Sequence, residues 1–502
     1  MRKHLAENFD TIYILDLSGN VRKNPKLSGT THNVFGIQVG VSVNFFVKKR
    51  DTPTTPAEIF YARVDEYWRK EDKYQFLDTQ ERYSNIEWAP ITPDSQHTWL
   101  TQGLHADFES FVPIGSNVAK RTKGGSGEAT FSLYSCGVVT SRDSLVYSFD
   151  LKLLKNQVRT FIEIYNTTAD RKKRHGPTSP IEDFIDANDS RIKWSHRAKE
   201  SLKKTQFSNY QDSCFRTSLY RPFTQKFLYF DHFWNERRYQ QYRIFPTTET
   251  ETENRVICVG GVASSKPFHA LVTQYIADFH LTGDSQCFPF YTYDEDGTNR
   301  RENITDWTLA QFRNHYRNDT IAKWDIFHYV YGILHHPTYR ERYVANLKRD
   351  LPRLPYAPDF WGFANAGARL AAIHVGYENV EEYQGGNGAP IFQLIETPGA
   401  RLDWRVVDKM KLSKDKTQLK YNDYLTLDGI PSRVFDYRLG NRSALEWVID
   451  QYRVKTDKRS GIVNDPNRAD DPQYIIRLIR KVITVSLETV SIVEDLPPLK
   501  SE

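Results

Sequence analysis

The residues best suited to chemistry are cations interleaved with aromatic rings in the window 191–243. This window holds twelve Lys and Arg residues against four Asp and Glu residues, together with thirteen aromatic residues. Such cations can bind a nucleic-acid backbone, while planar side chains lie against sugars or bases. Composition alone favours the alternative, a half-buried sheet covered by Arg and Lys stems. Under the first interpretation, the candidate DNA-binding residues here are Arg221, Arg237 and Arg238.

A second basic window covers residues 433–468. Lys455, Lys458 and Arg459 precede a short turn, and Arg442 lies in an earlier turn, before Ser443. Ser443 is placed to cap a helix that begins at residue 444. Arg, Lys and Asn side chains in such turns can enter a major groove and read the edges of G or A. Without further context, a solvated loop is the favoured alternative.

The sequence lacks the usual patterns of catalytic and metal sites. The four cysteines include no CxxC pair, and no phosphate-binding loop, GxGxxG fingerprint or HExxH motif is present. His335 and His336 are adjacent and favour a structural role, while residues 294–297 favour a turn over a calcium loop. We therefore predict no catalytic residue, no cofactor-binding residue and no metal ligand in this chain.

The hydrophobic patterns predict the elements that position these residues. We expect a helix over 2–9, strands over 11–17 and 39–47, and an amphipathic helix carrying Ile59, Phe60, Val64, Tyr67 and Trp68. Further along, we expect a β-rich region over 84–150, helices over 151–165 and 196–205, and a helical pair over 320–351. Pro337 suits the first turn of the second helix of that pair. A last helix is expected around 475–487.

Length and composition bound the class of protein. The chain has 502 residues, which suggests about three domains. With 39% hydrophobic and 26% charged residues it is globular, and its net charge of +5 confines any nucleic-acid surface to local patches. No apolar run approaches the length of a membrane span, and the N-terminus is charged, so we expect a cytoplasmic protein.

Several short sequence segments, in the same order along the chain, resemble the C-terminal part of single-chain type ISP restriction–modification enzymes. They are residues 1–5 (MRKHL), 13–20 (YILDLSGN), 22–26 (RKNPK), 35–41 (FGIQVGV), 220–223 (YRPF), 327–335 (FHYVYGILH) and 438–447 (RLGNRSALEW). The resemblance covers essentially the whole chain. Because many segments match in the same order, the resemblance is more specific than any single motif.

The resemblance implies a mixed α/β fold. Residues 1–50 would be the C-terminal remnant of a Rossmann-like N6-adenine methyltransferase domain. Residues 51–150 would be a connecting helix and β-rich region, and residues 151–495 a DNA target-recognition domain. It also implies that Arg22, Lys23 and Lys26 lie on the methyltransferase side of the DNA cleft.

The resemblance further implies sequence-specific recognition of double-stranded DNA. The full-length family methylates adenine from S-adenosylmethionine, uses ATP and Mg²⁺, and restricts DNA. This chain has no Asn-Pro-Pro-Tyr type motif, and its only Pro-Pro is Pro497–Pro498. We therefore expect a fragment that binds no cofactor and is inactive alone.

Two alternatives remain open. The chain could be one half of a split adenine methyltransferase, completed by an upstream chain that docks on residues 1–50. It could also be a non-catalytic protein- or glycan-interaction module that uses its aromatic residues. The second alternative predicts little salt dependence and no duplex binding.

Overall fold

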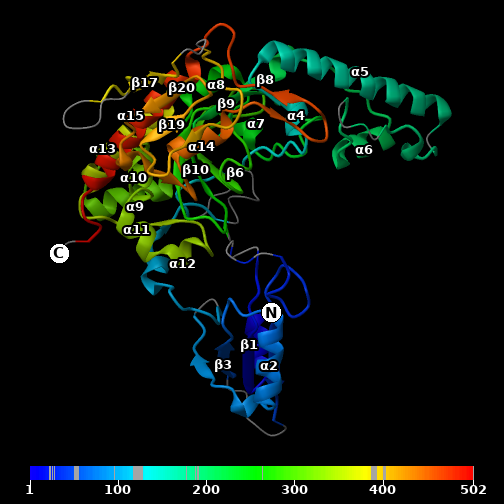
Figure 1. Ribbon diagram of the computed structural model, residues 1–502. Helices are drawn as coiled ribbons and strands as arrows, with labels where there is room; N and C mark the ends of the chain where they lie inside the picture. Colours follow the sequence, from blue (N-terminus) through cyan, green and yellow to red (C-terminus); the bar gives the residue numbers. More distant parts are fainter. Residues whose placement is uncertain are drawn as a thin grey trace. The chain divides into compact units, whose positions relative to one another are not determined.

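The computed structural model divides the chain into two compact units, Met1–His105 and Ala106–Glu502. It describes residues 1–500 apart from positions 22, 23, 25, 26, 28, 50–55, 95–96, 117–127, 177, 187, 189–190, 263, 386–392 and 399–402. The mixed α/β class predicted from the sequence is confirmed (Figure 1). The functional boundaries expected at residues 50 and 150 stay a prediction, because compactness does not assign function.

The first unit is built on a four-stranded sheet with the order β2-β1-β3-β4. Strand β1 (Thr11–Asp16) pairs antiparallel with β2 (Ser42–Val47) and parallel with β3 (Glu58–Arg63), which pairs antiparallel with β4 (Ala89–Ile91). Ile12 and Leu15 of β1 are buried. Helices α1 (Arg2–Asn8) and α2 (Lys70–Gln80) belong to this unit. The expected helix over 2–9 and strand over 11–17 are thus confirmed.

The predicted helix containing Ile59 to Trp68 is wrong. Residues 58–63 form β3, in which Ile59 is buried opposite Ile12 of β1. The helix begins later, where the Asp72 carboxylate accepts a hydrogen bond from the Arg69 backbone N–H (2.9 Å). Pairing with a neighbouring strand outweighed the local helical pattern. The strand expected over 39–47 is present, but only from Ser42.

Two four-stranded sheets form the centre of the second unit. The first has the order β11-β10-β13-β6 and the second the order β12-β8-β9-β7. The strands of the first are β6 (Ser135–Cys136), β10 (Val256–Gly260), β11 (Ala270–Thr273) and β13 (Ser285–Pro289); those of the second are β7 (Tyr147–Ser148), β8 (Phe215–Arg221), β9 (Thr224–Tyr229) and β12 (Ile276–Ala277). Strands β10, β11 and β13 are almost entirely buried.

Helices cover these sheets (Figure 1). The closest helix pair is α10 (Lys323–Ile333) and α13 (Phe360–Val375), where Gly332 and Gly367 let the backbones approach: a Cβ on Gly367 would lie 1.8 Å from the His328 carbonyl oxygen. The expected helical pair is confirmed, and Pro337 lies in the first turn of α11 (Pro337–Arg342). The other helices here are α7 (Gln241–Ile244), α8 (Thr248–Glu253), α9 (Asp306–Tyr316), α12 (Val344–Leu347), α14 (Ala444–Gln451) and α15 (Tyr474–Glu494).

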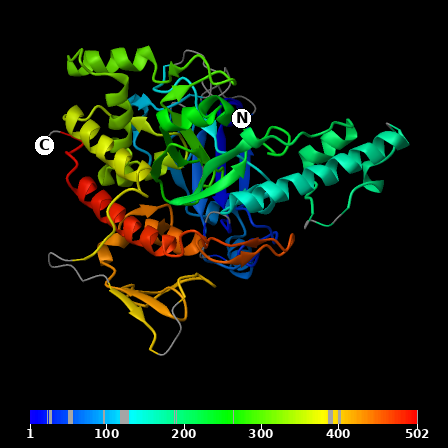
Figure 2. The same ribbon diagram turned by 90° about the horizontal axis from the view of Figure 1, so that it is seen from above.

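Peripheral elements extend from this centre. A sheet with the order β17-β20-β19-β18 lies far from α5 in both views (Figures 1 and 2). Its strands are β17 (Gln393–Glu396), β18 (Lys411–Leu412), β19 (Gln418–Lys420) and β20 (Leu425–Asp428). The short two-stranded pairs are β5 (Val112–Pro113) with β16 (Arg353–Leu354), β14 (Tyr291–Thr292) with β15 (Arg301–Glu302), β21 (Arg438–Leu439) with β22 (Arg442–Ser443), and β23 (Lys455–Thr456) with β24 (Val463–Asn464).

Two helices of the 151–205 region were expected, and both are present. Helix α5 (Leu151–His175) is capped by Asp150, whose Oδ1 accepts a hydrogen bond from the Leu153 N–H (2.9 Å). It continues ten residues beyond the expected end at 165, because its buried apolar stripe continues to Ala169. Helix α6 (His196–Lys203) confirms the second. Among the described residues, no helix is long and apolar enough to span a membrane.

Candidate nucleic-acid interface

The fold brings the two basic windows together. Lys226, on β9, donates a hydrogen bond from Nζ to Oδ1 of Asn464, on β24 (2.9 Å). These two residues are 238 positions apart in the chain. The hairpin formed by β23 and β24 therefore rests against the sheet that contains Tyr220 and Arg221.

Two polar cavities lie beside this hairpin. One, of about 280 Å³, is lined by Tyr220, Arg221 and Lys226 from the first window and by Lys455 from the hairpin. The other, of about 300 Å³, is lined by residues that include Lys193 and Arg459. Both share Asp143 and Ser144 of α4 (Asp143–Val146) and Asp457 at the hairpin turn. The hairpin turn and α4 thus border both cavities with mixed donors and acceptors.

The turn of the hairpin is held by one carboxylate. Oδ1 of Asp457 accepts hydrogen bonds from the Arg459 N–H (3.2 Å), the Ser460 N–H (2.8 Å) and the Ser460 hydroxyl (2.8 Å). The Gly461 N–H donates to the Asp457 carbonyl (2.8 Å), and Gly461 adopts φ +68°, which glycine tolerates best. The tip is therefore conformationally defined before any ligand binds.

Lys455, Lys458 and Arg459 are exposed on this hairpin. Within the described part of the chain, none of the three forms an ion pair. Three free cations on a rigid tip form a surface suited to phosphates or base edges. The structure therefore places these candidates where a nucleic acid can reach them, and their contact with DNA stays a prediction.

Arg221 is differently placed. Its Nη1 lies 2.8 Å from Oδ1 of Asp278, and its guanidinium stacks 3.9 Å from the centroid of the Tyr220 ring. Burial raises the pKa of Asp278 to about 6, although Arg221 opposes this shift. The Tyr147 hydroxyl also donates to Asp278 (3.1 Å). Arg221 thus stabilises the wall of the 280 Å³ cavity through an internal pair.

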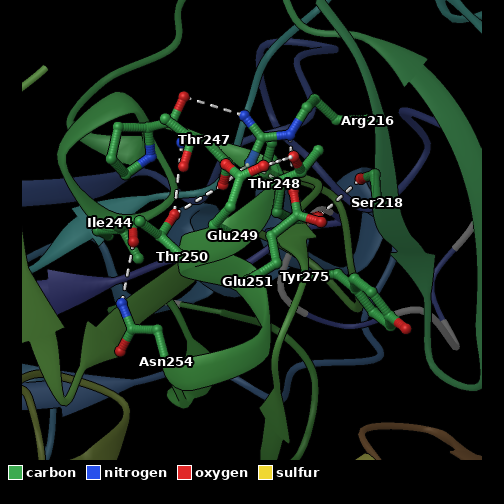
Figure 3. Close-up of polar contacts among 12 residues, drawn as sticks. Arg216, Ser218, Ile244, Thr247, Thr248, Glu249, Thr250, Glu251, Asn254 and Tyr275 are labelled. Atoms are coloured by element: carbon green, nitrogen blue, oxygen red, sulfur yellow. Dashed lines mark hydrogen bonds and ion pairs between the residues drawn. The ribbon is translucent and has the colours of Figure 1, made fainter. Parts of the chain in front are cut away.

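A second buried pair fixes β8 to α8 (Figure 3). Nε of Arg216 donates to Oε1 of Glu251 (2.8 Å), and its Nη1 and Nη2 donate to the carbonyls of Pro246 (3.2 Å) and Thr247 (2.6 Å). Burial raises the pKa of Glu251 to about 7, against the influence of Arg216. This cation of the first window is buried and cannot meet a ligand.

The other predicted site residues differ in whether their side chains are exposed or already paired. Arg238 lies 3.3 Å from Glu295 and beside the rings of Phe230 and Tyr242. Arg237 is exposed, and its backbone forms two 2.9 Å hydrogen bonds with Val139.

Arg442 pairs with Asp450 (2.7 Å) and lies over the Trp447 ring. The expected cap on α14 is confirmed, since the Ser443 hydroxyl accepts from the Glu446 N–H (3.2 Å). Arg22, Lys23 and Lys26 lie outside the described residues.

Lys226 is a site residue that we did not predict. Its ammonium lies 4.1 Å from the Tyr220 ring centroid and 4.6 Å from that of Phe149. Burial, followed by the charge of Arg221, lowers the pKa of Lys226 to about 7. The signal was available in the sequence, because Thr224, Lys226 and Leu228 alternate with period two on the buried face of β9.

No group of three or more His, Cys, Asp or Glu residues suited to a metal ion occurs among the residues that the structure describes. His335 and His336 confirm the structural interpretation: Nδ1 of His335 lies 2.8 Å from the Tyr331 carbonyl, and both side chains are buried.

Comparison with solved structures gives matches over 100% of this chain. A nuclease-deletion mutant of the type ISP restriction–modification enzyme LlaGI, solved with a DNA substrate mimic, matches with TM-score 0.79 and 30% identity. A DrdV–DNA complex matches with a TM-score of 0.80 and 35% identity. The ATP-dependent type ISP enzyme LlaBIII, bound to DNA, matches with a TM-score of 0.81 and 27% identity.

The chain spans 45%, 49% and 32% of the lengths of LlaGI, DrdV and LlaBIII, respectively. No curated protein matches the chain at a significant level. The family profile of the type ISP C-terminal specificity domain matches residues 129–478, which contain the hairpin, both cavities and the two basic windows. The chain therefore belongs to the type ISP C-terminal specificity domain family.

Proposed function

We propose that this chain recognises a specific sequence in double-stranded DNA, as the specificity portion of a type ISP restriction–modification enzyme. The observation that carries the proposal is the rigid hairpin with three exposed cations, Lys455, Lys458 and Arg459, inside the family's specificity domain. The three structural neighbours described above were solved in complex with DNA or a DNA substrate mimic, which supports the choice of ligand.

In this proposal, some side chains of the hairpin supply affinity and another supplies specificity. Lys455 and Lys458 neutralise phosphates, and each contact releases counterions. Arg459, next to the turn, has the planar fork that fits the O6 and N7 acceptors of guanine, a contact worth about 1–3 kcal/mol of discrimination. Because Asp457 already orders the turn, binding costs less conformational entropy than a mobile loop would.

We assign no methyl-transfer step to this chain. Asp16, the carboxylate at the carboxyl end of β1, already accepts hydrogen bonds from the Tyr61 hydroxyl (2.9 Å) and the Ser18 N–H (2.8 Å). Arg63 lies 3.7 Å from the same carboxylate. These contacts support our expectation that this chain alone binds no S-adenosylmethionine. We expect calorimetry to detect no micromolar binding of this cofactor, and a clear isotherm would contradict us.

Selection from a randomised duplex library, at low and at moderate salt, tests the proposal. Enrichment of one short asymmetric site supports autonomous recognition. Salt-sensitive binding without enrichment would mean that a further polypeptide is needed to complete the reading surface. A folded sample that binds no duplex at either salt concentration would overturn the proposal and favour a protein- or glycan-interaction module.

A second candidate function is favoured by the edge strand β2. Phe45, Phe46 and Val47 are 43%, 40% and 40% exposed on a strand that, among the residues the structure describes, pairs on one side only. Such an apolar edge suits the addition of another strand. We propose, as this alternative, that an upstream chain completes an adenine methyltransferase there. Methylation restored by co-expression with such a chain, and lost when Phe45→Lys is introduced, would support it.

A further inference from the structure

Helices α5 and α6 form a cationic lobe, residues 151–210, that extends away from the central sheets (Figure 2). The segment contains thirteen Lys and Arg residues against seven Asp and Glu residues. Part of it, residues 191–210, belongs to the first basic window, but residues 151–190 belong to neither window. The recognition proposed above does not use this charge.

Aromatic residues of the lobe pack on Trp234, which lies outside the lobe, and leave Arg159, Arg171 and Lys173 exposed. Phe161 and Tyr165 of α5 pack on Trp234, with ring centroids 4.5 and 5.3 Å away. Lys152, Arg159 and Arg171 of α5 are exposed. The cations therefore lie on a supported surface rather than on a loose segment.

Three of these cations lie over aromatic rings. Arg159 lies 4.7 Å from the Tyr210 ring centroid, Arg171 lies 5.9 Å from that of Phe184, and Lys173 lies 5.9 Å from that of Phe207. In the described part of the lobe, none of the three has a carboxylate partner, whereas Lys155, Arg174 and Lys203 are paired with Asp212, Asp170 and Glu200. Contact with an aromatic ring holds a guanidinium in place while its N–H edge stays available, which lowers the entropy cost of binding a phosphate.

The lobe starts beside the hairpin and continues away from it. Leu153 and Gln157 of α5 line the same cavity as Lys455 and Asn464. The 25 residues of α5 span about 37 Å, which is about 11 base pairs of DNA at 3.4 Å per step. A duplex held at the hairpin would therefore have flanking phosphates within reach of the lobe.

We propose that the α5–α6 lobe binds phosphates of the duplex that flanks the recognised site, through Arg159, Arg171 and Lys173, without reading sequence. This inference rests on the DNA recognition proposed above. It adds a second contact region with a different task, because cations that meet only phosphates add affinity and salt dependence but no base discrimination.

The test uses the full chain and two duplexes that contain the selected site. One ends at the site, and the other extends it by about 15 base pairs on each side, slightly more than the reach of α5. The lobe variant is R159Q/R171Q/K173Q. The control, K411Q/K414Q/K420Q, removes three exposed charges from the sheet β17–β20, which lies far from α5 in both views (Figures 1 and 2). Of these three, Lys420 forms an ion pair with Asp423 (2.8 Å). Thermal unfolding confirms that both variants are folded.

We expect the lobe variant to lower the slope of log K against log salt by about 2–3 on the long duplex, and to leave the short duplex unchanged. The control should match the wild type on both. Equal slopes for the lobe variant and the control on the long duplex would overturn the inference while leaving hairpin recognition intact. Failure of the wild type to bind either duplex would instead overturn the proposed function, and this inference with it.

Discussion

Arginines of the first basic window and the cations of the β23–β24 hairpin in the second differ in whether they have ion-pair partners. In the window 191–243, Arg216, Arg221 and Arg238 pair with Glu251, Asp278 and Glu295. In the window 433–468, the hairpin cations are exposed and have no described ion-pair partner. Each of these carboxylates lies outside the window, 35 or 57 residues further along the chain than its arginine. Local cation density therefore does not tell which cations a ligand can reach.

The largest effect that would sharpen this comparison is on stability. Arg216→Met leaves Glu251 buried without a partner, so we expect a loss of about 3–5 kcal/mol in unfolding free energy. Chemical denaturation measures it. The double variant R216M/E251Q should recover part of the loss, because the uncompensated charge is gone. A cost below about 1 kcal/mol for Arg216→Met would show that this cation is not a structural element.

Substitutions in the hairpin should affect DNA binding and leave stability almost unchanged. The variant K455Q/K458Q/R459Q should lower the salt slope of duplex binding by about 2–3, while its unfolding free energy changes by less than about 0.5 kcal/mol per substitution. Titrations at several salt concentrations, with denaturation in parallel, check both parts. An unchanged slope would remove the hairpin from the proposed interface.

Lys226 lies where the two windows meet and should respond to pH. Its pKa is lowered to about 7 in the folded state, so between about pH 7 and 10.5 the unfolded chain binds a proton that the folded chain does not. Stability from this group is thus greatest above pH 10.5, and it falls by about 1.4 kcal/mol per pH unit as the pH drops towards 7. Lys226→Met should remove this slope, and Lys226→Arg should not reproduce the titration. A wild-type curve that is flat over this range would contradict the burial argument.

The smallest expected effect concerns the turn. Asp457→Ala removes the acceptor that orders Arg459 and Ser460, and we expect about tenfold weaker specific binding with an unchanged salt slope, since the cations remain. Asp457→Asn keeps the acceptor oxygen and serves as the control. Equal binding by the two variants would show that turn order does not matter for recognition.

Hydrophobic periodicity predicted the regular elements, because their buried residues recur at regular spacing along the sequence. The strand at Thr11, the capped helix at Ser443 and the proline-initiated helix at Pro337 each carry their signal within a few residues. The helix predicted at Ile59 was wrong, because pairing with the strand that contains Ile12 decides the conformation of this segment.

The candidate site was predictable only in part. The exposed cations at 455, 458 and 459 follow from the turn chemistry around them. The pairing of Arg216 and Arg221 with distant carboxylates, and the contact of Lys226 with Asn464, depend on long-range packing that no local pattern encodes.

The support of the β23–β24 hairpin is separate from its exposed side chains. Asn464 and Asp457 hold the hairpin through contacts that do not involve the side chains of Lys455, Lys458 and Arg459. Exchanges at these three positions therefore carry little penalty for folding. Under the proposed function, such a hairpin can change its target sequence by single substitutions while the rest of the domain stays as it is.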